Sequence, residues 1–83
     1  MKSDPYMFLI DLLSKMYNPL VIEVYEDRIR QAALFLNDQW DSDIWLVFDR
    51  DFHWKFGRPN VADFTHGPNV VIKVQHYISE YLD

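Results

Sequence analysis

The stretch DIWLVFDRDFHWKFG (residues 43–57) contains two alternating runs of residues on either side of Asp49-Arg50-Asp51. Such alternation is typical of two antiparallel strands joined by a tight turn. Pairing Phe48 with Phe52 leaves a three-residue loop, whereas a two-residue loop would mix the two faces. The longer loop gathers the large apolar side chains on one face: Ile44, Leu46, Phe48, Phe52, Trp54 and Phe56, with Trp45, Val47, His53 and Lys55 on the other. An isolated hairpin is marginal in water, so this apolar face must pack against other elements.

Three segments around the hairpin have helical periodicity. Pro5, Pro19 and Pro68 each follow a polar or glycine residue and precede apolar residues at helical spacing. Proline is favourable at the first position of a helix. The sequence therefore predicts helices at about 5–17, 19–37 and 68–82. The β-branched residues in 20–25 leave a strand there as the alternative.

The predicted order of elements is α-α-β-β-α. Eighty-three residues leave no room for a second core, so we expect a single domain covering residues 1–83. The expected fold class is α+β, a small two-layer domain with a β-hairpin packed against helices.

No apolar run has the length of a membrane span, and Asp4 and Asp11 interrupt the apolar start of the chain. With no cysteine either, the expected location is cytoplasmic, with no membrane partner.

Sequence motifs for catalysis are missing. Gly57 and Gly67 are the only glycines, so no glycine-rich phosphate loop exists, and there is no thiol nucleophile. The three histidines, at positions 53, 66 and 76, lack the close spacing of zinc ligands. We expect that the protein is not an enzyme and that it uses no cofactor.

One short motif could hold a divalent ion. Asp49 and Asp51 are followed by His53 and Lys55, and alternate residues of a strand share a face. Aspartate is also favoured at hairpin turns for geometric reasons alone. We prefer the turn interpretation and expect no metal site.

The segment NDQWDSDIW (residues 37–45) places two tryptophans among three aspartates. One interpretation is a helix end, a polar turn and the start of a strand, with the Trp45 ring lying over Lys55. The other is an interface, in which tryptophan is the anchor and the carboxylates form a rim that attracts a basic partner. The aromatic content of 17% favours an interface, because a small core cannot enclose all of these rings. The predicted partner-binding residues are Asp38, Trp40, Asp41, Asp43 and Trp45, joined by Glu23, Glu26 and Asp27 if the second helix packs alongside.

The charge distribution narrows the class of partner. The net charge is −5; residues 1–43 hold 8 acidic and 4 basic side chains, and residues 44–83 hold 5 and 4. We expect a small acidic protein-binding domain that occludes a basic surface of a nuclease or nucleic-acid-binding protein. Its short, acidic, cysteine-free and aromatic-rich profile resembles that of inhibitor, immunity and phage anti-defence proteins.

Two alternatives belong to other classes of function. The first is a self-assembling protein, a homodimer formed through surplus aromatic side chains or the edge of the hairpin. The second is a DNA-binding protein, because the order helix-helix-hairpin resembles a winged helix. Its second helix carries Glu23, Glu26 and Asp27 against Arg28 and Arg30. Phosphate binding needs clustered positive charge, so direct contact with nucleic acid is not expected.

Overall fold

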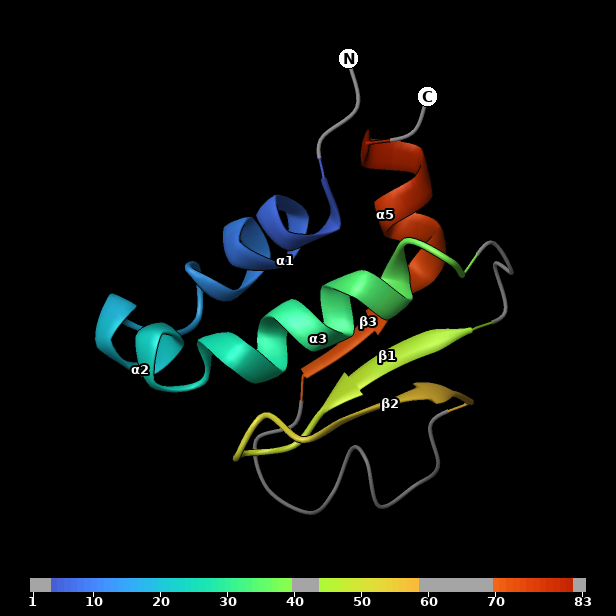
Figure 1. Ribbon diagram of the computed structural model, residues 1–83. Helices are drawn as coiled ribbons and strands as arrows, with labels where there is room; N and C mark the ends of the chain where they lie inside the picture. The colour runs from blue at the N-terminus through green and yellow to red at the C-terminus, as the bar shows by residue number, and fades with distance from the viewer. Residues whose placement is uncertain (1–3, 40–43, 59–69, 82–83) are drawn as a thin grey trace.

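The computed structural model describes residues 4–39, 44–58 and 70–81, and the chain forms an α+β domain (Figure 1). Its helices are α1 (Pro5–Leu13), α2 (Pro19–Val24), α3 (Glu26–Leu36) and α5 (Val74–Tyr81). Its strands are β1 (Trp45–Phe48), β2 (Trp54–Gly57) and β3 (Val70–Lys73), in the order β2-β1-β3. No helix in these ranges is both long and apolar enough to cross a membrane.

The helix α1 begins where the sequence predicts and ends four residues earlier. The Asp4 carboxylate accepts a hydrogen bond from the Met7 N–H at 2.9 Å, and Pro5 follows this cap. After Leu13, a tight turn brings the N–H groups of Met16 and Tyr17 to the Leu13 carbonyl. The prediction extended this helix to residue 17, but the residue before a proline is extended, so the chain must leave the helix before Pro19.

The segment 19–37 is helical, as predicted, but it forms two helices. The Asn18 side chain accepts a hydrogen bond from the Val21 N–H at 3.1 Å and caps α2. At Tyr25, between α2 and α3, the backbone leaves helical geometry with φ −106° and ψ 18°. The Tyr25 ring stacks on Phe52 from the hairpin, with ring centroids 5.0 Å apart. A continuous apolar stripe could not reveal this break, because the contact joins residues far apart in sequence.

The predicted hairpin is present, with its turn moved one residue along the chain. Phe48 pairs with Trp54, not with Phe52. The loop is Arg50-Asp51-Phe52, closed by hydrogen bonds from the Asp49 N–H to the His53 carbonyl and from the Phe52 N–H to the Asp49 carbonyl. Three-residue hairpin loops commonly end with a residue at positive φ, and Phe52 has φ 59°. The partner of Phe48 thus lies two residues later than predicted. Because side chains alternate between faces with a period of two, every side chain stays on its predicted face.

The C-terminal segment corrects one prediction. Residues 68–82 were expected to form one helix, but β3 occupies Val70–Lys73 and α5 begins at Val74. Val70 and Ile72 are buried while Val71 and Lys73 are half-buried, which is the alternation of a strand. Consecutive β-branched residues prefer extended backbone, and β3 pairs with the side of β1 that the hairpin leaves open.

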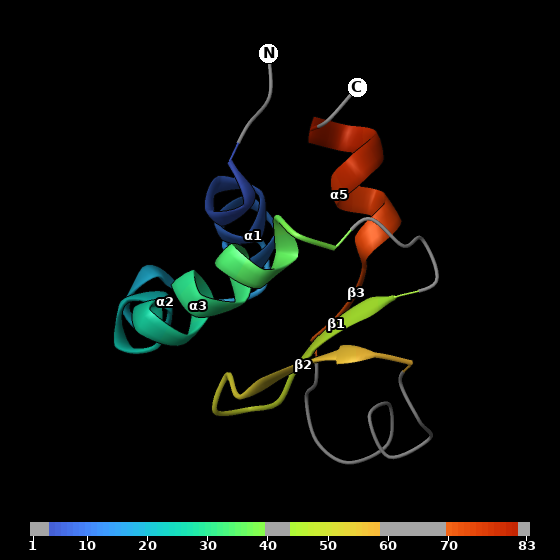
Figure 2. The same ribbon diagram turned by 45° about the vertical axis from the view of Figure 1, so that its right-hand side comes forward.

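The helices lie on one side of the sheet, so the fold has two layers (Figure 1, Figure 2). From α1 and α3 the core receives Phe8 and the fully buried Leu9, Leu13, Ile29 and Leu36. From the sheet side the core receives Leu46, Phe48, Phe52, Val70 and Ile72, with Ile44, Trp54 and Phe56 packed against it. The apolar face predicted for the hairpin is therefore the face that packs against the helices.

Candidate functional site

The structure describes two of the five residues predicted to bind a partner in segment 38–45. Asp38 is exposed in the turn that follows α3. Trp45 is half-buried at the start of β1, on the sheet face turned away from the helices. The Lys73 ammonium lies 5.7 Å from the centre of the Trp45 ring. Lys73 belongs to β3, a strand that the sequence did not predict. The remaining three, Trp40, Asp41 and Asp43, lie outside the described residues.

The second predicted acidic group lies at the other end of α3. Glu23 is near the end of α2, and Glu26 and Asp27 form the first turn of α3. Carboxylates in that position also stabilise the helix through its dipole. Glu26 makes an ion pair with Arg30 at 2.9 Å. Asp38 follows α3 and lies about 16 Å away along the helix axis. The structure therefore does not bring Asp38 together with Glu23 and Asp27.

The outer face of α2 carries apolar side chains that the core does not use. Leu20 is 72% exposed and Val24, one helical turn later, is 73% exposed. Only Ile22 of this helix is buried. Glu23 is exposed between Leu20 and Val24 in sequence, and Asp27 is exposed beyond them. We call Leu20, Glu23, Val24 and Asp27 the α2 surface.

A shallow hollow adjoins this surface where α2 meets α3. Its volume is about 320 Å³, and it is lined by Val24, Tyr25, Asp27 and Arg28. The Arg28 guanidinium donates a hydrogen bond to the Asp51 carbonyl oxygen at 2.6 Å. Contacts from Tyr25 and Arg28 to the hairpin thus hold two walls of the hollow in place.

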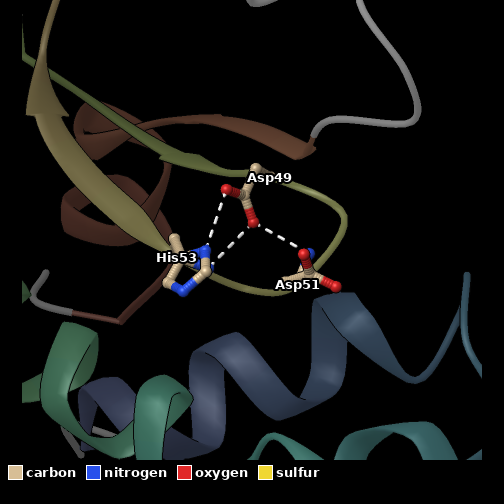
Figure 3. Close-up of side chains that lie close together, drawn as sticks. All are labelled: Asp49, Asp51 and His53. Carbon is tan, nitrogen blue, oxygen red and sulfur yellow. Dashed lines mark hydrogen bonds and ion pairs between the residues drawn. The ribbon is translucent and has the colours of Figure 1, made fainter.

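The hairpin tip contains the one cluster in the described ranges with the composition of a cation site (Figure 3). Ligand atoms of Asp49, Asp51 and His53 lie within 4.8 Å of one another. However, Asp49 Oδ1 accepts hydrogen bonds from the backbone N–H groups of Asp51 and His53, at 2.8 and 3.0 Å. Its Oδ2 lies 3.1 Å from the His53 Nδ1. The Asp49 carboxylate thus already makes hydrogen bonds within the hairpin turn, which supports the turn interpretation.

Local hydrogen bonding also changes the acidity of Asp49. Partial burial acts to raise the pKa of the Asp49 carboxyl, but the hydrogen bonds from the His53 and Asp51 backbone and from the His53 ring outweigh it. The pKa therefore lies below its ordinary value, because the folded loop stabilises the charged form. The geometry explains this shift without a bound ion.

Comparison of the chain with protein-family models, with curated proteins and with solved structures gives no match. The functional proposal therefore rests on the surface of the molecule.

Sequence reasoning named Glu23 and Asp27 but missed the apolar part of the α2 surface. The stripe through Val21 and Tyr25 was sufficient to predict a helix, so Leu20 and Val24 received no separate role. One signal was present in the sequence. Every residue of the segment PLVIEV except Glu23 is apolar, so a helix of this kind either buries several sides or leaves apolar side chains exposed.

Proposed function

We propose that this protein is a small acidic protein-binding domain that uses the α2 surface and the adjoining hollow to occlude a basic surface of another protein. The observation that carries the proposal is the pair Leu20 and Val24, both nearly three-quarters exposed and one turn apart. Isolated exposed apolar side chains are common, but an apolar pair bordered by carboxylates has the composition of an interface centre and its rim.

The two kinds of side chain have different roles in this proposal. Leu20 and Val24 enter an apolar depression on the partner and lose their contact with water, which stabilises the complex. Glu23 and Asp27 remain at the edge, attract a positively charged partner during approach, and orient it. A surface that binds phosphate presents clustered Lys and Arg, so it suits this rim. Occlusion needs no catalytic group and no cofactor.

A winged-helix mode of DNA binding has less support. Its recognition helix would be α3, whose exposed side includes Leu34 and Phe35. Arg30 on that helix is already paired with Glu26. Phosphate contacts require cations that are available and clustered.

Binding with immobilised protein tests the proposal. Host extract is passed over the wild-type protein and over two double variants, Leu20→Ser/Val24→Ser and Glu23→Gln/Asp27→Asn. We expect retention of a basic protein that duplex DNA displaces. We also expect that retention is lost in the apolar variant and that its salt dependence weakens in the charge variant.

Matched controls come from the other end of α3. Leu34→Ser removes an apolar side chain that is also 73% exposed, and Asp38→Asn removes an exposed carboxylate. Neither should change retention. Equal retention by the wild-type protein and both double variants would refute the proposal, as would a retained protein that DNA does not displace.

A further inference from the structure

The outer edge of β2 has backbone groups directed away from the sheet. In an antiparallel pair, residues that exchange hydrogen bonds alternate with residues that do not. The hydrogen bond from the Asp49 N–H to the His53 carbonyl makes these residues a bonded pair, so Val47 and Lys55 are the next bonded pair. Trp54 and Phe56 lie between bonded positions. Their N–H and C=O groups therefore point outward, and no strand of the described chain pairs with that edge.

The pairing of β1 with β3 gives the same alternation independently. The Val74 N–H donates to the Ile44 carbonyl at 3.0 Å, so Leu46 and Phe48 are the β1 residues that bond to β3. Each residue of β1 thus directs its backbone groups to one neighbour only, which supports the orientation derived for β2.

An aromatic row borders this edge on the helix side of the sheet. The Phe35 and Trp54 ring centroids are 5.1 Å apart, and those of Trp54 and Phe56 are 5.7 Å apart. Phe35 is 54% exposed, and Trp54 and Phe56 are half-buried. On α3, Phe35 faces β2, whereas Leu34 lies on the side of Arg30, whose guanidinium is 4.1 Å from the Tyr6 ring of α1.

We propose that the outer edge of β2 binds an extended segment of another protein as a fourth, antiparallel strand. Residues opposite Trp54 and Phe56 exchange backbone hydrogen bonds with them and place their side chains on the aromatic row. The residue between these two lies opposite Lys55, on the other face. The segment that fits this edge therefore has an apolar, an acidic and an apolar residue at three successive positions.

A second copy of this chain fits the edge less well. The register that pairs Trp54 with Phe56 of a second copy, and Phe56 with its Trp54, places Lys55 directly opposite itself. Like charges at facing positions destabilise a strand pair, and lysine on a short edge strand is a common protection against self-pairing. An acidic residue at that position removes the repulsion. This edge is separate from the α2 surface, so either proposal can fail without the other.

Amide exchange followed by NMR tests the inference on the full chain, with the capped peptide Ser-Val-Glu-Val-Ser as the probe. In the free protein, the Trp54 and Phe56 amides should exchange much faster than those of Val47 and Lys55. Saturating peptide should slow the exchange of Trp54 and Phe56. The same peptide with Lys in place of Glu should bind several-fold more weakly, and Lys55→Glu should reverse that preference.

The aromatic row has a matched pair of variants. Phe35→Ala should weaken peptide binding about tenfold, because it removes one end of the row, whereas Leu34→Ala should leave it unchanged. Three results would overturn the inference. They are slow exchange of the Trp54 and Phe56 amides in the free monomer, protection that rises with protein concentration and not with peptide, and binding that is insensitive to Phe35→Ala.

Discussion

The helices α2 and α3 are neighbours in the chain, yet the core uses most of the apolar side chains of α3 and few of those of α2. In α3 the inward residues are buried: Ile29, Ala32, Ala33 and Leu36. In α2 only Ile22 is buried, while Leu20 and Val24 face solvent. Folding explains the helical spacing of the four buried α3 residues, whereas Leu34 and Phe35 of the same helix are exposed. Folding does not explain the mostly apolar composition of α2 in this way. The functional proposal rests on α2 for this reason.

The attachment of the two helices to the rest of the fold differs in the same way. The long apolar face of α3 packs between α1 and β2. At the end of α2, Tyr25 contacts the hairpin tip through its ring, and it lies 5.7 Å from the Arg28 guanidinium. Substitutions in α3 should therefore act on stability, and substitutions on the outer face of α2 should act on binding.

The largest expected effect is the loss of stability when a buried leucine of α3 is truncated. Leu36 is fully buried, so Leu36→Ala should lower the free energy of unfolding by about 2–5 kcal/mol. Leu20→Ala removes the same atoms from an exposed position and should change that free energy by less than about 0.5 kcal/mol. Urea denaturation of both variants measures the difference. Similar losses would mean that α2 stabilises the fold as α3 does, and would weaken the functional proposal.

An intermediate effect is expected at the junction of the two helices. Tyr25→Ala removes the ring that stacks on Phe52 and should cost about 1–2 kcal/mol of unfolding free energy. Tyr25→Phe keeps the ring and loses only a hydroxyl that lies 3.5 Å from the Asp51 carboxylate, so it should cost less than about 0.5 kcal/mol. Urea denaturation compares the two variants. Equal losses would assign the junction to the hydroxyl and not to ring stacking.

Features that depend on near neighbours in sequence could be predicted, and features that depend on distant ones could not. The starts of α1 and α2 follow from Asp4-Pro5 and Asn18-Pro19, because a cap and a proline act over one helical turn. The faces of the hairpin follow from alternation. The break at Tyr25 depends on Phe52, and β3 depends on the open side of β1. The spacing of apolar residues along the sequence predicts neither of these contacts.

The candidate site shows the same limit. Glu23 and Asp27 could be named because charge is visible in the sequence. Whether they join Asp38 in one surface depends on the length of α3, which separates them. Leu20 and Val24 could not be assigned to the surface, because α2 is apolar except for Glu23 and the sequence does not reveal which of its other sides the core covers.

The smallest expected effect concerns the loop on which the junction packs. The pKa of the Asp49 carboxyl is lowered in the folded protein, so its charge stabilises the fold above its unfolded pKa of about 3.8. That contribution is lost as the pH falls through the lower, folded value. Asp49→Asn should reduce the free energy of unfolding at pH 7 by less than about 1 kcal/mol, because the group is partly exposed.

Urea denaturation of this variant between pH 7 and pH 2 measures the contribution of the charge. The substituted amide keeps an acceptor oxygen for the turn but carries no charge, so the difference from the wild-type protein should shrink toward pH 2. Asp38→Asn, in an exposed turn away from the hairpin, corrects for the change in net charge. No difference from the wild-type protein at any pH would show that the Asp49 oxygen supports the hairpin as an acceptor alone, because the amide keeps that acceptor. The position of Phe52 beneath Tyr25 would then depend on turn geometry and not on charge.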